Sequence, residues 1–191
     1  GVVSNTATVN ITVNPVNDPP VATNDTATVD EGNTVVIAVK GNDTDAEDGT
    51  PAGVVTIVGA PANGTVTVNA NGTVSYVHDG SETTSDSFTY TVTDSNGVVS
   101  NTATVNITVN PVNDAPVPNV TSATGNEDTV IAVNLSGSDV DGTVASFKLT
   151  SLPANGTFYS NAAATNPLTL ASVINATSNA ATIYFKPNAN W

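Results

Sequence analysis

The chain has 191 residues, with 17 Asp and Glu side chains against 3 Lys and Arg, and a formal net charge of −14. So few cations cannot neutralise a phosphate backbone or hold an anionic membrane surface, which excludes nucleic acids and such membranes as partners. The chain contains no Cys and one His, so disulfides, thiol chemistry and cysteine zinc sites are excluded. No apolar run is long enough for a membrane-inserted helix. An acidic, thiol-free chain suits an extracellular, secreted or cell-surface setting.

A long internal repeat divides the chain. Residues 1–20 read GVVSNTATVNITVNPVNDPP, and residues 97–116 repeat them with Ala115 in place of Pro19, at an offset of 96 residues. A repeat of this length fits one small β-sandwich. We therefore expect three parts: residues 1–14 as the last strand of a preceding repeat, residues 17–110 as a complete repeat, and residues 113–191 as a second repeat that stops before its final strands.

The complete repeat shows strand patterns in chain order. Residues 34–40 (TVVIAVK) alternate with Val35, Ile37 and Val39 on one face. Residues 64–78 alternate on both sides of Asn71-Gly72, a dipeptide typical of hairpin turns. Period-two alternation of this kind indicates half-buried strands.

Two further strands are expected near the end of the repeat. Residues 86–93 (DSFTYTVT) place Phe88, Tyr90 and Val92 inward, and residues 102–109 (TATVNITV) place their Ala, Val and Ile side chains inward. No stretch combines helical periodicity with caps. About seven short strands per repeat predict an all-β fold of tandem immunoglobulin-like, antiparallel Greek-key β-sandwiches. The proline-rich linkers at 14–20 and 110–116 predict short, stiff joints between them.

Comparison of the two copies selects a set of acidic residues. Glu31, Asp43 and Asp45 are retained 96 residues later, whereas Asp25 and Asp30 are replaced. Acids that served only solubility would be free to change in the same way. The retained acids and their counterparts are Glu31, Asp43, Asp45, Glu127, Asp139 and Asp141.

The D-x-D pairs in this set predict a Ca²⁺ site. Two carboxylates separated by one residue in an extended loop can face the same side. Oxygen donors with no soft ligand nearby favour Ca²⁺ over zinc or copper. The linker residues Asp18 and Asp114, together with Asp94 in a later turn, can add oxygens at the same end of a sandwich.

The order of these motifs resembles that of cadherin repeats. The linker VNDPP at 16–20, Glu31, the D-x-D at 43–45 and the TVTD at 91–94 occur in that order. The whole unit is most similar to the bacterial cadherin-like tandem repeats of large secreted surface adhesins. The resemblance implies Ca²⁺ at the joints between domains. It assigns Glu31, Asp114, Asp139 and Asp141 to the joint inside this chain, and Asp18, Asp43, Asp45 and Asp94 to the preceding joint.

Two departures reduce the number of ions expected. Pro15 stands where the cadherin linker has an additional Asp, and the mid-domain Asp-Arg-Glu motif has no counterpart. One or two ions per joint are therefore expected. The resemblance implies a non-catalytic, calcium-stiffened spacer in cell adhesion or biofilm formation. Its partners would be neighbouring repeats, and host or matrix glycans or proteins reached through other domains.

Other interpretations remain open. The retained acids can be solvated surface charge, and Asp18 and Asp114 can serve only turn formation beside proline. A module that binds a glycan or protein directly requires exposed aromatic side chains, for which Tyr76, Tyr184 and Trp191 are the candidates. An accessory domain of an enzyme is a further alternative, although no set of catalytic residues is present. Residues 1–14 can also donate a strand to another copy, in homotypic exchange or in a filament.

Overall fold

The computed structural model describes residues 1–189 and consists only of strands and loops. Backbone contacts divide it into two compact units, unit 1 (Gly1–Pro111) and unit 2 (Val112–Trp191). Within the described residues, no helix is long and apolar enough to cross a membrane. The expected all-β class is confirmed.

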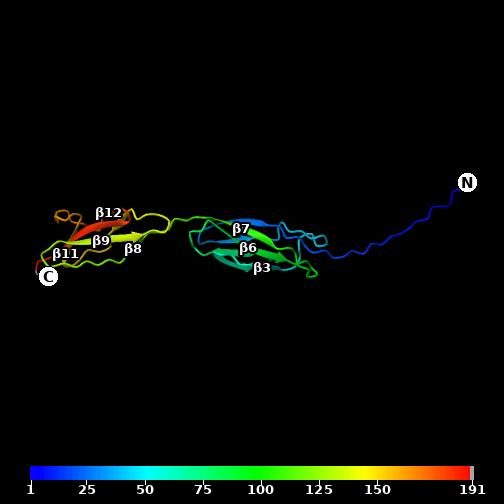
Figure 1. The fold of residues 1–191 in the computed structure, drawn as a ribbon, viewed down its shortest axis with the longest axis horizontal. Coiled ribbons are helices and arrows are strands. Elements are labelled where there is room, and N and C mark those ends of the chain that lie inside the picture. Colours follow the sequence, from blue (N-terminus) through cyan, green and yellow to red (C-terminus); the bar gives the residue numbers. More distant parts are fainter. Residues whose placement is uncertain (190–191) are drawn as a thin grey trace. The chain divides into compact units, whose positions relative to one another are not determined.

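Unit 1 is a sandwich of two sheets, with strand orders β1-β7-β6-β3 and β2-β5-β4 (Figure 1). Its core combines Ile37, Val74 and Tyr76 of one sheet with Tyr90 and Val105 of the other. The seven strands match the number expected from the sequence. They are β1 (Asp25–Asp30), β2 (Thr34–Ile37), β3 (Val55–Gly59), β4 (Gly64–Val68), β5 (Val74–His78), β6 (Ser85–Val92) and β7 (Ala103–Asn110).

The predicted inward faces of β6 and β7 form the centre of this core. Each strand alternates between apolar and polar residues, so one row of side chains faces the opposite sheet. In β7 the exposed fractions are 1% for Ala103, 0% for Val105 and 2% for both Ile107 and Val109. In β6, Phe88, Tyr90 and Val92 are equally buried. These strand predictions are confirmed.

The hairpin predicted at Asn71-Gly72 joins β4 to β5. The Asn69 amide donates to the Thr73 carbonyl at 2.8 Å, and the Gly72 amide donates to the Asn69 carbonyl at 2.9 Å. Gly72 has φ +81°, a left-handed conformation that glycine adopts without steric cost. The loop is therefore a three-residue turn that closes on a left-handed glycine.

The pairing of the first and last strands differs from the antiparallel arrangement that we expected. β1 pairs with β7 in parallel, from Asp25 opposite Val105 to Asp30 opposite Asn110. Hairpins impose antiparallel pairing on consecutive strands, but β1 and β7 are the two ends of the unit and no hairpin joins them. Because they run in the same direction, the chain enters unit 1 at one end and leaves it at the other.

Unit 2 contains one sheet of order β11-β13-β9-β8 and a two-stranded sheet of β10 and β12. The pairings β11-β13-β9 repeat those of β4-β5-β2 in unit 1. No described strand of unit 2 corresponds to β6 or β7, and residues 119–130 are exposed. The strands are β8 (Val117–Pro118), β9 (Ile131–Ser138), β10 (Ser146–Lys148), β11 (Gly156–Tyr159), β12 (Val173–Asn175) and β13 (Ala180–Pro187).

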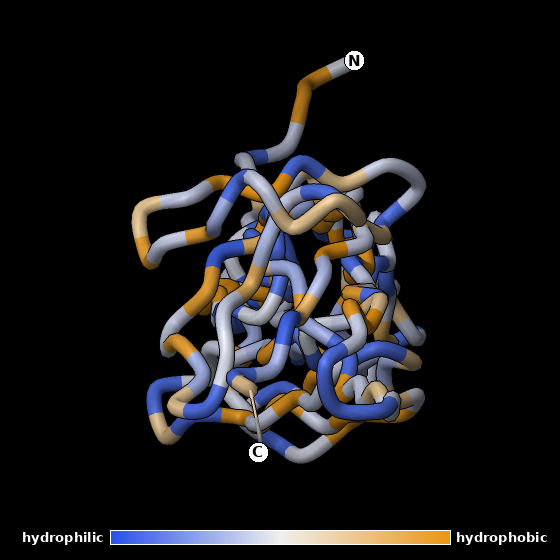
Figure 2. The backbone as a smooth tube through the Cα atoms, turned by 90° about the vertical axis from the view of Figure 1, so that its left-hand side faces the viewer, coloured by the Kyte–Doolittle hydropathy of each residue, from blue (hydrophilic) through white to orange (hydrophobic). Residues whose placement is uncertain are grey.

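The segment that precedes β1 belongs to no strand. Figure 1 shows it as a trace without arrows, and Val9, Ile11 and Val13 are each more than 80% exposed. Its residues 6–13 alternate between polar and apolar, as the same sequence does in β7. Figure 2 shows hydrophobic residues in orange near the free N-terminal end of the tube. The pattern of a strand is therefore present here without a sheet.

Candidate metal site at the ends of the sandwiches

The end of unit 1 where the chain enters gathers three acidic segments. Val21 and Thr44 form a bridge, which places the linker beside the D-x-D loop. The Asp18 amide donates to Glu47 Oε2 at 3.2 Å. Farther along the chain, Ser95 donates its amide and its hydroxyl to the Asp48 carboxylate, at 2.7 and 3.0 Å. The structure thus brings the linker, the loop at 45–48 and the turn at 94–96 together.

Asp45 is the most informative side chain at this end. It is 8% exposed, and its Oδ1 accepts hydrogen bonds from the amides of Glu47 (3.0 Å) and Asp48 (2.7 Å). Its Oδ2 is buried and has no hydrogen-bond partner. A buried polar atom without a partner is costly and rare in folded proteins. A bound cation would satisfy this oxygen.

Asp94 is held by hydrogen bonds from the linker and from its own turn. Its Oδ2 accepts from Asn17 Nδ2 at 2.6 Å, and its Oδ1 accepts from the amides of Asn96 (2.9 Å) and Val98 (2.8 Å). The bond from Asn17 is the main cause that lowers the pKa of Asp94, and the backbone amides add to it against the opposing effect of burial. Asn96 Nδ2 donates in turn to Asn17 Oδ1. Asp94 is therefore a carboxylate anchored to the linker.

Asp43, the first acid of the D-x-D pair, makes different contacts. It is 3% exposed, and its Oδ1 accepts from the Thr23 amide (2.8 Å) and lies 3.1 Å from the hydroxyl of Tyr90. The Tyr90 hydroxyl also lies 2.9 Å from Asp25 Oδ2. Burial raises the pKa of both carboxyls above the usual 3.8, and their mutual repulsion adds to the shift of Asp25. The side chain of Asp43 therefore hydrogen-bonds within the core, whereas Asp45 retains a free oxygen.

The D-x-D loop of unit 2 also has one buried oxygen without a hydrogen-bond partner, but on the other acid of the pair. It is Asp139 Oδ1, and Asp139 is the counterpart of Asp43, not of Asp45. Burial, and then the neighbouring carboxylate of Asp141, raise the pKa of Asp139. The Asp114 amide donates to Asp141 Oδ2 at 3.3 Å, so the linker again touches the acidic loop. A Cβ on Gly142 would stand 3.1 Å from Asp139 Oδ2, so glycine leaves room for the carboxylate.

The remaining acids of the predicted set are Glu31, which lies before β2, and Glu127, which lies before β9, the counterpart of β2 in unit 2. Glu31 follows β1, and its amide donates to the Asn110 carbonyl at 2.9 Å. A carboxylate oxygen of Glu31 lies within 4.8 Å of one of Glu82. In unit 2, Glu127 is exposed in the turn before β9. Asp139 follows the other end of that eight-residue strand, so Glu127 does not join the D-x-D loop.

Sequence reasoning missed three acids that the structure places beside predicted ligands. Glu47, Asp48 and Glu82 would ordinarily be assigned to solubility. Glu47 and Asp48 immediately follow the D-x-D pair, and their amides hold Asp45 in place. Their position next to the D-x-D pair could have identified Glu47 and Asp48 from the sequence. Nothing in the sequence links Glu82 to Glu31, because 51 residues separate them.

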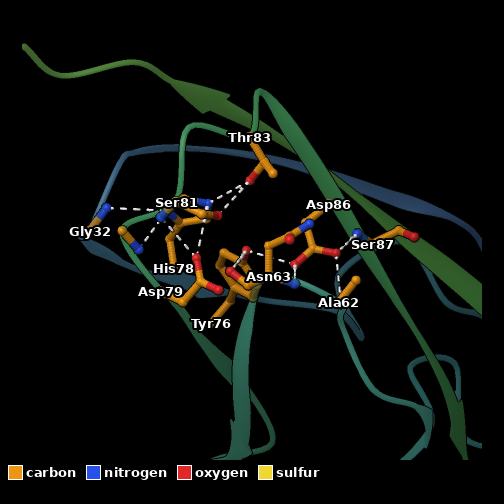
Figure 3. A network of polar contacts seen from close by, with 11 residues as sticks. Gly32, Ala62, Asn63, Tyr76, His78, Asp79, Ser81, Thr83, Asp86 and Ser87 are labelled. Atoms are coloured by element: carbon orange, nitrogen blue, oxygen red, sulfur yellow. Dashed lines mark hydrogen bonds and ion pairs between the residues drawn. The ribbon is translucent and has the colours of Figure 1, made fainter. Parts of the chain in front are cut away.

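A second polar network in unit 1 is structural. His78 is 2% exposed, and its Nδ1 accepts from the amides of Gly32 (3.2 Å) and Gly80 (3.3 Å). The proton must then lie on Nε2, which donates to Thr83 Oγ1 at 3.0 Å (Figure 3). Both ring nitrogens are therefore used, which leaves the histidine no lone pair for a metal and no free position for proton transfer.

Asp86 lies in the same view and fixes the loop before β4. Its carboxylate accepts from the amides of Ala62, Asn63 and Ser87 and from the Tyr76 hydroxyl, at 2.8–3.0 Å (Figure 3). Burial alone would raise the pKa of Asp86, but these hydrogen bonds outweigh it and the pKa is lowered. Asp86 is thus a structural carboxylate.

Among the described residues, the two aromatic candidates for direct binding, Tyr76 and Tyr184, do not form an exposed patch. Tyr76 is 0% exposed, so its prediction as an exposed contact residue is wrong. Tyr184 is half-buried in β13. Trp191 lies outside the described residues.

The profile of the family described as bacterial cadherin-like domain matches residues 17–111. No curated protein matches the chain. Among solved structures, a chimeric titin Z1Z2 is 12% identical, with a TM-score of 0.31 over 91% of this chain and 84% of that chain. The D00-D0 domain of intimin is 12% identical, with a TM-score of 0.33 over 86% and 83%. The endo-fucoidan hydrolase MfFcnA4 is 17% identical, with a TM-score of 0.40 over 88% of this chain and 24% of that chain.

Proposed function

Because residues 17–111 belong to the bacterial cadherin-like domain family, we propose that this chain is a non-catalytic spacer in an extracellular, cell-surface adhesin. Its joints bind Ca²⁺, and the ion stiffens the array. The observation that carries this proposal is the buried carboxylate oxygen without a partner in each D-x-D loop, at Asp45 and at Asp139. Each loop thus has one buried oxygen that a cation would satisfy, on the second acid of the motif in unit 1 and on the first acid in unit 2.

The donors around each loop fit Ca²⁺. Every candidate ligand is an oxygen, and hard oxygen ligands favour Ca²⁺ over softer transition metals. The proposed ligands at the entry end of unit 1 are Asp18, Asp45 and Asp94, with Glu47 added. Asp43 joins them if it exchanges its hydrogen bond from Tyr90 for the ion. The proposed ligands of unit 2 are Asp114, Asp139 and Asp141.

A bound ion would act on the linkers as well as on the loops. In unit 1 the Asp18 amide donates to Glu47, two residues after the D-x-D pair, and in unit 2 the Asp114 amide donates to Asp141 of the pair itself. A divalent cation reduces the repulsion among these carboxylates in a chain of net charge −14. With its carboxylate and its amide both held at the loop, the linker loses freedom of rotation. A spacer of fixed length follows from this restriction.

A non-catalytic role agrees with the use of the titratable groups. His78 has both nitrogens in structural hydrogen bonds, and Asp86 holds backbone amides. The described residues thus offer no histidine or cysteine to activate a nucleophile.

Thermal unfolding in EDTA and in rising Ca²⁺, with Mg²⁺ as a control, tests the proposal. An ion that binds only the folded state stabilises it. A dissociation constant of 10⁻⁴–10⁻³ M, usual for extracellular modules, gives about 1.4–2.7 kcal/mol per site at about 10 mM Ca²⁺. The Asp45→Asn and Asp139→Asn variants should lose this gain. Asp79→Asn, an equal charge change beside His78, should keep it. No Ca²⁺-specific rise in the melting temperature of the unaltered chain would refute the ion sites.

A further inference from the structure

The outward face of the β1-β7-β6-β3 sheet in unit 1 carries almost no charge. Side chains alternate between the core and solvent along each strand, and the register of the sheet shows which outward side chains are neighbours. At the end of β1, the outward Asp30 carboxylate accepts from Asn110 Nδ2 at 2.9 Å. Every other outward side chain of these four strands is threonine, serine, asparagine or valine. We call this surface the threonine face, and its centre consists of Thr104, Asn106 and Thr108 of β7 and Ser87, Thr89 and Thr91 of β6.

This face differs from the rest of unit 1 in its charge. The chain has a net charge of −14, and the acids of unit 1 lie in loops and near strand ends, as in the D-x-D loop and the turn at 94–96. Protein surfaces ordinarily carry charged side chains at about 25–35% of their positions. The centres of protein interfaces, by contrast, are depleted of charged residues. The threonine face therefore has the composition of a contact surface, although Ser87, Asn106 and Thr108 at its centre are exposed.

The chemistry of the threonine face suits a second copy of itself. Threonine and serine hydroxyls and the asparagine amide each donate and accept hydrogen bonds, so two identical faces can pair about a twofold axis. A face of carboxylates would repel its own copy. The net charge of −14 therefore directs any close approach of two molecules to the surfaces that carry no charge. Threonine is also stiff about its first side-chain torsion, so little side-chain entropy is lost when such a face is buried.

The size of the face limits the strength of such a contact. Four strands about 4.8 Å apart and up to eight residues long, at about 3.3 Å per residue, cover roughly 500 Å². Two such faces bury about 1,000 Å², which is close to the lower limit for a specific interface. The outward face of the β2-β5-β4 sheet is also uncharged, but its shorter strands cover only about half that area. The larger face is therefore the one that we expect to dimerise, and the dimer should be weak.

We propose that the threonine face is a self-association surface, through which unit 1 of one molecule packs face to face with unit 1 of a second copy. The two sheets lie about 10 Å apart, and their strands cross at about 30°. Asn106 and Ser87 lie at the centre of the contact, and hydroxyl and amide groups hydrogen-bond across it. The contact needs no Ca²⁺, so it is independent of the ion sites proposed above. In an array of such repeats, several weak contacts would act together and hold neighbouring chains side by side.

A dilution series followed by NMR in EDTA, from about 1 mM to about 0.01 mM protein, tests the location of the contact. Amides of β6 and β7 should shift with protein concentration, and those of β4 and β5 in the opposite sheet should not. Sedimentation equilibrium over the same range gives the dissociation constant of the dimer. The test variant is Asn106→Asp, which adds one charge at the centre of the face and keeps the shape of the side chain. The matched control is Asn71→Asp, the same change at an exposed position of the β4-β5 hairpin.

Asn106→Asp should weaken the dimer at least about tenfold, because the dimer brings two like charges together, whereas Asn71→Asp should change its affinity less than about twofold. Equal effects of the two variants, or shifts confined to the β2-β5-β4 sheet, would overturn the proposal. An unaltered chain that stays monomeric at about 1 mM would overturn it as well. If the β6 and β7 amides of such a monomer shifted on addition of dextran, a neutral polysaccharide, the face would bind a glycan instead. The dilution series of the unaltered chain decides between these outcomes even if a variant is less stable.

Discussion

Residues 1–14 and 97–110 have the same sequence and different structures. In the second copy, ATVNITVN forms β7, whose inward side chains are buried in the core of unit 1, whereas in the first copy its side chains are exposed and unpaired with any described strand. The alternation of apolar and polar residues is identical, so it cannot by itself produce a strand. What differs is the presence of β1 and β6 on either side and of an opposing sheet. Strand formation here depends on tertiary context more than on local preference.

The largest effect on stability is expected when the same substitution, valine to aspartate, is made separately at equivalent positions of the two copies. Val105→Asp buries a charge at a site that is 0% exposed, and we expect it to lower the free energy of unfolding of unit 1 by more than about 3 kcal/mol. Val9→Asp, at 81% exposed, should change it by less than about 0.5 kcal/mol. Urea unfolding of both variants at low protein concentration measures the difference. Comparable losses would mean that residues 1–14 also pack in a core.

A second prediction concerns β1 and its counterpart. Asp25–Asp30 forms a strand because β7 lies beside it, and residues 121–126 pair with no strand in the described part of the chain. Amides of β1 that donate to β7 should therefore exchange with solvent on the order of 10³-fold more slowly than those of residues 121–126. Hydrogen exchange followed by NMR or mass spectrometry gives both rates in one sample. Equally slow exchange in the two segments would show that residues 121–126 are paired as well.

The stability of unit 1 should depend on pH through two carboxyls of β1 and the D-x-D loop. Burial raises the pKa of Asp25 and Asp43 above 3.8, so the folded state holds these protons more tightly than the unfolded chain. The stability of unit 1 should then fall as the pH rises from about 3.8 through the raised pKa values, and be constant above them. Asp25→Thr, which introduces the residue found at position 121, should reduce this loss. We expect a difference of less than about 1 kcal/mol, because solvent screens a partly exposed group.

Chemical denaturation in EDTA at a series of pH values from 4 to 7 measures this effect. The contribution of Asp86 and Asp94 has the opposite sign, because their pKa values are lowered. Their stabilisation is present above about 3.8 and is lost as the pH falls through the lowered values. An unchanged slope above pH 4 in the Asp25→Thr variant would contradict the assignment.

The smallest effect on stability is expected at position 19, where residues 1–20 and 97–116 differ. Pro19 is exposed and its peptide bond is trans, and the corresponding residue is Ala115. Pro19→Ala should destabilise the chain by about 0.4–1 kcal/mol, because alanine increases the freedom of the unfolded chain. Thermal melts of the two proteins in EDTA check this. A larger loss would indicate that Pro19 makes specific contacts in the joint.

The sequence predicted those features that depend on alternation or on a single turn. The inward faces of β6 and β7 and the hairpin at Gly72 follow from residues that are neighbours in the chain. The parallel pairing of β1 with β7 could not be predicted, because about 80 residues separate the partners and either direction satisfies the same pattern.

The sequence also predicted only part of the candidate site. Comparison of the copies identified Asp45 and Asp139, and these are the acids with buried oxygens that lack partners. The comparison of the copies also selected Asp43 as a ligand, although the Asp43 carboxylate accepts a hydrogen bond from the Tyr90 hydroxyl. That contact forms because β6, which carries Tyr90, lies across the core from residue 43. The D-x-D pattern holds no information about this long-range packing. Glu82 approaches Glu31 by a similar long-range packing.

The most direct test of the account is a Ca²⁺ titration followed by NMR at the backbone amides of the two D-x-D loops. We expect saturable shifts at residues 45–49 and 139–142, with no comparable change at Asp79 or Asp128 and none with equal Mg²⁺. Absence of shifts up to about 10 mM Ca²⁺, beyond the range of extracellular modules, would contradict the central claim. Shifts of equal size at every exposed acid would contradict it as well, because they would show only diffuse attraction of cations to a negatively charged protein.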